Sequence, residues 1–537
     1  MPPPERAPRW GLLAALAGVV AAAVFLAAAE LVALLLGGAG SPLVAVGGAA
    51  IDLAPRPVKD LMVTLFGTGD KAALFVLMAV LLAAITSGAG MLEFRRRPLG
   101  ALVFGIGGVI ALVAVMTRSG SGSFDGAPTV VGVLAAIVVL QAANRRLRRW
   151  RDALARTAVP AAFPAASGTG SAPAVPSSVA VERRAFLVWT VAAGAAAVVV
   201  GTGARIVDAA HTAAAAARRA IRLPPAATKE AVPAGASLDV AGITPYVTSN
   251  ADFYRIDTAL RVPSVDPASW TLRIHGAVDH EVEITWEELL ALPLEEHMAT
   301  LSCVSNEVGG DLIGNALWLG YPIRKLLERA APHAGADMVL SRSVDGFTAG
   351  TPLDVLQDDG TDALLAVGMN GEPLPAEHGF PVRMVVPGLF GYVSATKWVT
   401  EMEVTRFADA QGYWTPRGWS ARGPVKLESR IDTPADGATV AVGASVPIAG
   451  VAWEPHRGVR AVQVRIGEDA PWQDAELADS VSADTWRQWV YRWTATEGTH
   501  SVQVRAIDTD GVAQTSVIRP PAPNGATGWH TVTVTAA

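Results

Sequence analysis

The sequence predicts a chain of three parts: an N-terminal multi-span α-helical membrane region, then an α+β domain, then an all-β sandwich. Long apolar stretches occur only before residue 205, and mixed helix-like and strand-like patterns follow from about residue 238. From about residue 426, short alternating runs recur between turn residues. The composition agrees, because 17% of the 537 residues are charged, whereas soluble proteins average about 25%.

Five apolar stretches make up the predicted membrane region. They cover residues 10–36, 72–85, 99–116, 129–143 and 186–203. A spanning helix needs about 20 apolar residues, so the second and fourth stretches are short unless their uncharged flanks extend them. A re-entrant or surface-lying segment is the alternative for those two. We assign four spans to residues 1–158 and the fifth to residues 182–205.

Arginine clusters predict the orientation of these spans, because positive charges favour the cytoplasmic side. The clusters precede the first span, separate the second from the third, and follow the fourth: Arg6 and Arg9; Arg95, Arg96 and Arg97; Arg145, Arg146, Arg148, Arg149 and Arg151. All three agree if the N-terminus is cytoplasmic. Residues 159–181, rich in Ala, Pro, Ser and Gly, then form a flexible cytoplasmic linker. Everything after about Arg205 is expected to be extracytoplasmic, in a multi-pass protein of the cell membrane.

The entry to the fifth span carries a second signal. Residues 182–187 read Glu-Arg-Arg-Ala-Phe-Leu and resemble the twin-arginine export signal, whose pathway moves folded proteins. The alternative is a plain positive flank of a membrane helix, which does not account for the Phe-Leu pair. Residues 206–237 are expected to form a stalk, whose helical part ends at Pro224 and Pro225.

Histidine and cysteine content limits the electron-transfer groups that the chain can hold. No histidine precedes His211, so the spans cannot hold a haem between paired histidines, and no Cys-x-x-Cys-His motif exists. The single cysteine, Cys303, excludes an intramolecular disulfide, a four-cysteine zinc site and a cysteine-ligated iron–sulfur cluster. We therefore expect no haem and no iron–sulfur cluster. The formal net charge of -6 offers no footprint for nucleic acid.

Residues 238–425 predict an α+β domain. Residues 270–276 alternate like a half-buried strand, and Thr285 with Glu288 forms the capping box of a short helix. Residues 318–331 have apolar positions near helical spacing and predict an amphipathic helix. Residues 379–387 read as a buried strand closed by proline.

Residues 426–537 predict an antiparallel β-sandwich of immunoglobulin type. Residues 446–453, 461–466, 489–493 and 500–506 alternate with period two, with turn residues between them. Nothing in this domain looks catalytic. Its expected role is to pack against the preceding domain or a second copy.

Cys303 is the residue whose setting suggests chemistry. An isolated cysteine is often a buried small hydrophobic residue. Here it ends an apolar strand and enters a polar, glycine-rich loop. Such loops concentrate binding residues, and a soft thiolate suits a transition metal.

The blocks around Cys303 resemble, in order, the sulfite oxidase family of molybdopterin enzymes, which includes periplasmic protein-methionine-sulfoxide reductases. The resemblance runs from about residue 238 to the end, and its motifs are Asn250 with Phe253-Tyr254-Arg255, the loop 301–311, Trp318-Leu319-Gly320-Tyr321-Pro322 before Leu326-Leu327, His378-Gly379-Phe380-Pro381-Val382-Arg383, Thr396-Lys397-Trp398, and Gly412-Tyr413-Trp414 with Arg417-Gly418-Trp419. It implies a sulfite-oxidase-type molybdopterin domain at 238–425 and, at 426–537, the family's immunoglobulin-like dimerisation domain, hence a possible homodimer.

The resemblance also implies roles for single residues. Cys303 would ligate molybdenum, whose other sulfurs come from the pterin dithiolene, and Arg255 and Trp419 are the further catalytic candidates. The implied contacts to the pterin and its phosphate are Asn250, Tyr254, Arg255, Ser343, His378, Arg383, Thr396 and Lys397. Cationic side chains suit a phosphate dianion. The alternatives are a strand-edge surface arginine for Arg383, turn or strand-end residues for Asn250 and Ser343, and simple packing for Trp414 and Trp419.

The sequence departs from the family just after the cysteine. Family members that oxidise sulfite carry arginines there, whereas this chain has Glu307 and Val308. A carboxylate should repel a dianionic substrate, which favours a neutral or cationic substrate, a sulfoxide or an N-oxide. Alternatively, Glu307 and Asp311 are structural acids of the loop.

The resulting expectation is a membrane-anchored, extracytoplasmic oxidoreductase that performs two-electron oxygen-atom transfer at molybdenum. Electrons would pass one at a time to or from a cytochrome or a quinone-linked membrane subunit. An S- or N-oxide reductase, for example for methionine sulfoxide in proteins, is the closest alternative. A non-catalytic sensory or adhesion module that kept the fold is the alternative from another class.

Overall fold

The chain divides into two compact units, residues 1–212 and 213–537. The computed structural model describes residues 9–35, 41–55, 70–117, 124–157, 178–203, 220–259 and 262–537, with a few single residues between these ranges. Most of the expected linker, much of the expected stalk, and both Arg6 and Arg205 lie outside the described residues. Each unit is treated by itself.

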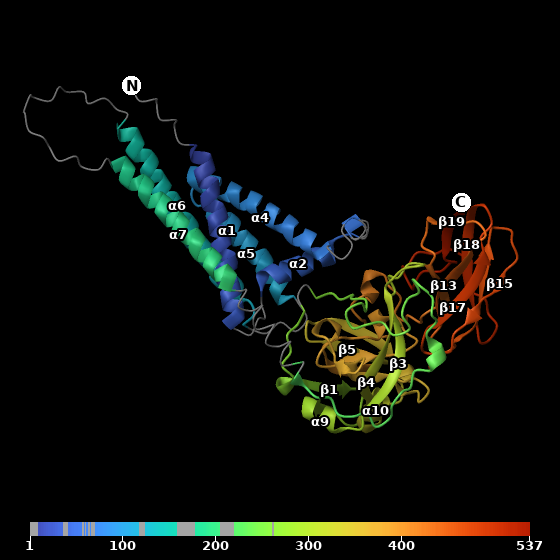
Figure 1. Ribbon diagram of the computed structural model, residues 1–537. Coiled ribbons are helices and arrows are strands. Elements are labelled where there is room, and N and C mark those ends of the chain that lie inside the picture. Colours follow the sequence, from blue (N-terminus) through green and yellow to red (C-terminus); the bar gives the residue numbers. More distant parts are fainter. Residues whose placement is uncertain are drawn as a thin grey trace, which may run out of the picture. The chain divides into compact units, whose positions relative to one another are not determined.

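The first unit consists of long apolar helices. They are α1 (Trp10–Leu35), α2 (Pro42–Leu53), α4 (Asp70–Arg95), α5 (Leu99–Met116), α6 (Ala127–Thr157) and α7 (Ser178–Gly203) (Figure 1). Among the described residues, four helices are long and apolar enough to cross a membrane: α1, α4, α5 and α6. The two stretches that are short in the sequence belong to α4 and α6, of 26 and 31 residues, so both reach spanning length. Helix α2 was not expected from the sequence.

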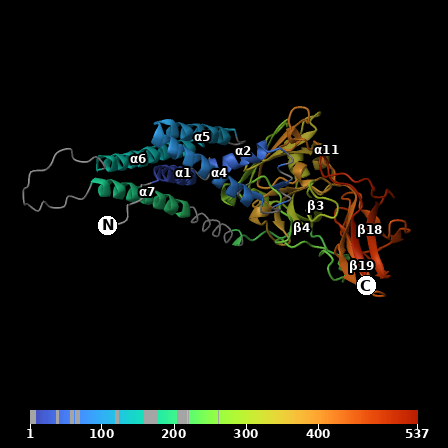
Figure 2. The same cartoon turned by 90° about the horizontal axis from the view of Figure 1, so that it is seen from above.

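Small residues let the helices of this unit approach closely. A Cβ atom added to Gly18 of α1 would lie 1.9 Å from the carbonyl oxygen of Thr86 in α4, and one added to Gly90 would lie 2.0 Å from that of Ala14. Such contacts between small residues are typical of helix packing in membranes. Figure 2 shows α1, α4, α5, α6 and α7 running side by side. Residues 182–187 lie inside α7, where Phe186 is buried. The centroids of the Phe186 and Trp150 rings are 6.2 Å apart.

The second unit begins with a domain of one mixed and one antiparallel sheet, which confirms the α+β prediction. One sheet has the order β2-β1-β10-β5-β6, and the other the order β3-β4-β7-β8 with β9 paired to β7. The strands are β1 (Thr271–Gly276), β2 (Val282–Thr285), β3 (Glu295–Ser302), β4 (Ile313–Pro322), β5 (Met338–Ser343), β6 (Thr348–Pro352), β7 (Leu364–Met369), β8 (Glu372–Pro373), β9 (Arg383–Val385) and β10 (Val399–Thr405). The helices are α9 (Trp286–Ala291), α10 (Ile323–Ala330) and α11 (Leu353–Gln357).

Two local predictions in this domain need correction, whereas the capping box at Thr285 is confirmed. The helix expected over residues 318–331 begins only at Ile323, because Trp318 to Pro322 complete β4 and pair with β3 and β7. The strand expected over residues 379–387 is limited to Arg383–Val385, the segment that pairs with β7. Pairing with distant strands therefore overrides the local patterns.

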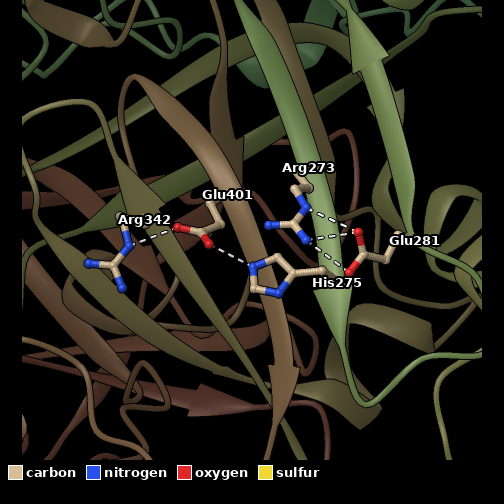
Figure 3. A network of polar contacts seen from close by, with 5 residues as sticks. All are labelled: Arg273, His275, Glu281, Arg342 and Glu401. Atoms are coloured by element: carbon tan, nitrogen blue, oxygen red, sulfur yellow. Dashed lines mark hydrogen bonds and ion pairs between the residues drawn. The ribbon is translucent and has the colours of Figure 1, made fainter. Parts of the chain in front are cut away.

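Ion pairs tie together the strands of the first sheet (Figure 3). The imidazole of His275 on β1 lies 2.6 Å from a carboxylate oxygen of Glu401 on β10, and the guanidinium of Arg342 on β5 donates to the same carboxylate at 2.8 Å. Arg273 pairs with Glu281 nearby. Because these groups are partly exposed, each pair adds little stability.

The second unit ends in an immunoglobulin-like β-sandwich, which confirms that prediction. Its sheets have the orders β11-β13-β17-β16 and β12-β19-β18-β14-β15. The strands are β11 (Glu428–Thr433), β12 (Ala438–Val440), β13 (Ser445–Trp453), β14 (Val459–Ile466), β15 (Gln473–Asp474), β16 (Glu476–Leu477), β17 (Arg487–Thr494), β18 (Gly498–Asp508) and β19 (Thr531–Ala536). Pairing is antiparallel except between β12 and β19. Its core includes the fully buried Trp489, Ile448, Val462 and Val504.

Candidate functional site

A pocket in the α+β domain brings together most of the residues expected at the site. About 940 Å³ of free space, its open mouth included, lies among side chains from several loops and strand ends. Of the sequence candidates, Tyr254, Cys303, Ser343, His378, Arg383, Lys397 and Trp419 line it.

Cys303 is presented to this pocket by the loop after β3. Its N–H donates to the carbonyl of Leu312 at 2.9 Å, and its own carbonyl accepts from the N–H of Asn306 at 3.0 Å. The Sγ atom accepts from the N–H of Ser305 at 3.4 Å. Burial raises the pKa of the Cys303 thiol, although the Ser305 contact lowers it. Without a metal the thiol therefore stays protonated, and a metal would have to displace the proton.

Arg383 is a buried cation that faces the same pocket. The residue is 5% exposed, donates to the carbonyl of His378 at 3.1 Å, and lies 5.0 Å from the ring of Trp318. Burial lowers the pKa of its guanidinium to about 10, so it remains charged. No carboxylate lies within ion-pair distance of it among the described residues.

An unpaired buried guanidinium is costly unless an anion binds it. The donor set at Arg383 therefore fits a phosphate group, which arginine binds through parallel hydrogen bonds. The position also excludes the alternative of a surface arginine at a strand edge. The residues present thus fit a cofactor that carries both an anionic group and a metal.

Lys397 and His378 also line the pocket. The ammonium of Lys397 donates to Asp257 at 2.9 Å and to the carbonyl of Glu377 at 3.0 Å, and burial lowers its pKa to about 8. The Nε2–H of His378 donates to the carbonyl of Asn250 at 3.0 Å, which leaves Nδ1 as an acceptor. Burial, and then the charge of Arg383, lower the pKa of His378 to about 4. His378 is therefore neutral near pH 7.

Three sequence candidates do not line the pocket. Asn250 bonds to the carbonyl of Met369 and to Asn370, so it supports the turn under His378, as the turn alternative supposed. The side chain of Arg255 is 42% exposed and pairs with Asp257 at 2.9 Å. Thr396 is fully buried and shares a hydrogen bond with Ser341. Their expected contacts to the cofactor have no counterpart in the pocket lining.

The acids after the cysteine are also absent from the pocket lining. Glu307 and Asp311 are exposed. Val308 lies beside Gly528 of the C-terminal domain, where a Cβ added to that glycine would lie 3.7 Å from the valine. Proximity to Cys303 in sequence therefore does not place these residues at the substrate.

The pocket mouth contains aromatic residues that sequence reasoning largely missed. Tyr392 and Phe347 join Trp414 and Trp419 in the lining. The rings of Tyr392 and Trp419 are 6.0 Å apart, and those of Trp414 and Trp419 are 6.3 Å apart. Tyr392 donates to the carbonyl of Ser420 at 2.7 Å, and burial raises its pKa to about 12. Its place in a short turn, residues 391–393, gives no periodic signal in the sequence.

Two family models match the second unit. Residues 259–414 match the oxidoreductase molybdopterin binding domain, and residues 428–504 match a bacterial Ig domain. The uncharacterized oxidoreductase YuiH of Bacillus subtilis is 34% identical over 158 residues, which are 29% of this chain and 76% of that protein. The chain belongs to the sulfite oxidase family of molybdopterin oxidoreductases.

Longer relatives match over part of their length. Mouse mitochondrial sulfite oxidase is 31% identical over 290 residues, which are 45% of this chain and 52% of that protein. The chain thus spans about half the length of this curated relative. The sulfane dehydrogenase SoxCD from Paracoccus pantotrophus aligns at 20% identity and a TM-score of 0.48, over 55% of this chain and 82% of that one.

This sulfite oxidase family member is therefore an oxidoreductase with a molybdopterin-binding domain. The family assignment rests on the second unit, since both matched segments lie there. It makes a non-catalytic module the weaker reading. It leaves the substrate and the electron partner to be inferred from this chain's own site.

Proposed function

We propose that the chain is a membrane-anchored, extracytoplasmic molybdopterin oxidoreductase that transfers an oxygen atom to or from an organic substrate and does not oxidise sulfite. One observation carries the proposal: a single pocket joins Cys303, the buried cation Arg383 and an aromatic mouth. When bound, the cofactor supplies the two-electron chemistry. The protein supplies the ligand, the cofactor site and the selection of substrate.

The residues divide this work by position. Cys303 supplies a thiolate to the metal, and Arg383 with Lys397 holds the anionic end of the cofactor. Neutral His378, fixed by the carbonyl of Asn250, offers an acceptor at Nδ1 and adds no charge. The aromatic rings exclude water from the reacting centre and orient the substrate.

The charges of the pocket argue against a sulfite dianion. Among the described residues that line it, the charged cations are Arg383 and Lys397. Lys397 is already paired with Asp257, and Arg383 is assigned to the cofactor. No cation then remains for a dianionic substrate. Glu307 does not line the pocket and therefore contributes nothing to this selectivity.

The aromatic mouth favours an uncharged organic substrate. Aromatic faces bind apolar groups and contact sulfur favourably. The aromatic residues therefore favour an S- or N-oxide reductase, acting for example on methionine sulfoxide in proteins. Assays with reduced and oxidised dyes against sulfite, sulfoxides and N-oxides would identify the substrate and the direction.

We predict that Trp419→Ala raises KM for an organic sulfoxide at least about tenfold, with a smaller change in kcat. Tenfold is the lower end of the loss in specificity that a small change in an apolar pocket causes. Steady-state kinetics measures this. Trp472→Ala is the matched control, because Trp472 lies in the C-terminal domain and contacts Trp529. Equal KM values for Trp419→Ala and the unaltered chain, or efficient sulfite oxidation, would refute the substrate class.

Metal analysis tests the cofactor. The full chain, purified in detergent from molybdate-fed cells, should contain about one molybdenum and one pterin per chain. If cells that supply molybdenum cofactor to other enzymes yield this chain without molybdenum, the proposed chemistry is refuted, although the fold assignment is unaffected.

The membrane proposal rests on the apolar helices of the first unit and on the arginines between them. A phosphatase reporter fused after residue 203 should be active, because that enzyme works only outside the cytoplasm, and a fluorescent reporter fused after residue 158 should be bright inside. The reverse pattern would overturn the orientation. The phosphatase reporter also tests the twin-arginine-like segment. If that signal directs export, replacing both arginines (Arg183→Lys with Arg184→Lys) should abolish the activity of the reporter.

The proposed two-electron chemistry requires an external electron-transfer partner. A one-electron carrier, a cytochrome or a quinone-linked membrane subunit, must exchange electrons with the site. Pairing through the C-terminal domain would cover exposed Val512, Val517 and Ile518, of which Ile518 is 86% exposed. Light scattering on the detergent-solubilised chain would detect such a dimer.

A further inference from the structure

The loop that carries Cys303 lies against the C-terminal domain. The guanidinium of Arg430, on β11, donates to the carbonyl oxygen of Gly310 at 2.8 Å. The ring of His530 packs on Gly309, where an added Cβ atom would lie 2.3 Å from the imidazole. Gly309 also has a φ of +80°, a conformation that favours glycine. The turn of the loop therefore fits against the C-terminal domain at two adjacent residues.

Arg430 is itself held rigidly. It is 8% exposed, and its guanidinium donates to Asp432 at 2.6 Å and to the hydroxyl of Thr244 at 2.7 Å. Asp432 in turn accepts from the N–H of Thr244 at 3.0 Å. A buried charge with its donors satisfied in this way specifies one geometry. The Gly310 carbonyl is thus bonded to a fixed donor.

The strand before the cysteine is tied to the same domain. The N–H of Thr300, on β3, donates to the carbonyl of Asp484 at 3.0 Å, and the N–H of Trp486 donates to the hydroxyl of Thr300 at 2.8 Å. Asp484 and Trp486 lie in the C-terminal domain. Both the strand that leads into Cys303 and the loop that leaves it are therefore anchored outside the α+β domain.

We propose that Arg430 is a positioning residue: by holding the Gly310 carbonyl, it fixes the loop that aims the Cys303 sulfur into the pocket. The C-terminal domain then has a role at the active site in addition to any role in pairing. The inference rests on the proposed function, in which Cys303 ligates the metal. Hydrogen bonds to groups next to a metal ligand orient that ligand and tune its metal.

Thiol labelling reads the position of the loop directly, because Cys303 is the only cysteine in the chain. With full chain lacking cofactor, Arg430→Met should label with a thiol reagent at least about tenfold faster than the unaltered chain, equivalent to about 1.4 kcal/mol. Arg505→Met is the matched control, since Arg505 in the same domain lies over Trp472, and its rate should stay within about twofold. Equal rates for Arg430→Met and the unaltered chain overturn the proposal.

Spectroscopy of the loaded enzyme supplies a second readout. Arg430→Met should alter the electron paramagnetic resonance signal of the one-electron-reduced metal, and Arg430→Lys, which retains a donor, should restore it in part. A signal identical in all three chains contradicts the positioning role. If the unaltered chain binds no molybdenum, the proposed function fails, while the labelling rates still decide whether Arg430 holds the loop.

A second variant covers the case in which Arg430→Met does not fold. Gly309→Ala leaves Arg430 intact but forces the loop away from His530, so Cys303 should label faster. The double variant Gly309→Ala with His530→Ala removes the clash and should recover part of the original rate. Labelling that is unchanged in Gly309→Ala would show that the contact with the C-terminal domain does not set the position of the thiol.

Discussion

Replacing Cys303 with serine should lower kcat by more than the roughly 10–100-fold that is typical when a residue hydrogen-bonded to a metal ligand is lost. A hydroxyl is a harder ligand than a thiolate and stays protonated near neutral pH, so it cannot replace the soft sulfur. The loss should be accompanied by disappearance of the absorption that arises from the cysteine sulfur and the metal, whereas absorption from the pterin sulfurs should remain. Because the pterin would still hold the metal through its own sulfurs, molybdenum content should fall much less than kcat.

The neighbouring Ser302→Ala is the matched control for this substitution. The Ser302 hydroxyl donates to the carbonyl of Cys303 at 3.4 Å, and the side chain is not part of the pocket lining. It should leave kcat within a few-fold of the unaltered chain. A Cys303→Ser enzyme with normal turnover and normal absorption would remove the central residue of the proposed site.

Replacing Arg383 with glutamine should lower cofactor retention by at least about thirtyfold, the equivalent of about 2 kcal/mol. The reason is that Arg383 is a buried cation and the proposed partner of the cofactor's anionic end. Pterin and molybdenum content after dialysis measure the effect. Arg383→Lys keeps the charge but loses the planar fork and should retain an intermediate amount.

The same substitution has the opposite effect on the chain without cofactor. There the buried guanidinium has no anion to compensate its lost hydration, so glutamine should raise the thermal midpoint or leave it unchanged. Arg273→Gln is the control, because Arg273 is an exposed arginine in an ion pair with Glu281 and should change neither quantity appreciably. If Arg383→Gln destabilised the cofactor-free chain and left cofactor content intact, Arg383 would be structural.

Several properties are determined by the sequence alone because their causes are local. Uninterrupted apolar runs are long enough to form helices such as α1 and α5 of spanning length, whatever packs around them. Alternation with period two predicted β13, β14, β17 and β18. A lone cysteine between an apolar strand and a glycine-rich loop indicated Cys303, and the ordered motifs around it indicated the family.

Other properties depend on contacts between distant segments. Trp318 belongs to β4 and not to a helix because β3 and β7 flank it, and neither partner is visible in a local pattern. Tyr392 reaches the pocket, whereas Asn250, Arg255 and Thr396 do not line it, because loop paths decide which side chains converge. The family motifs predict the order of these residues along the chain, but not which way their side chains point.

The cysteine loop shows the difference most clearly. From the sequence, Glu307 is four residues from the metal ligand and appears to face the substrate. In the folded chain it is exposed outside the pocket lining, and its neighbours Gly309 and Gly310 meet His530 and Arg430, residues more than a hundred positions away. The sequence by itself indicated the candidate ligand and the family, and only the tertiary structure decided which residues the cysteine loop contacts, because packing between domains sets the course of the loop.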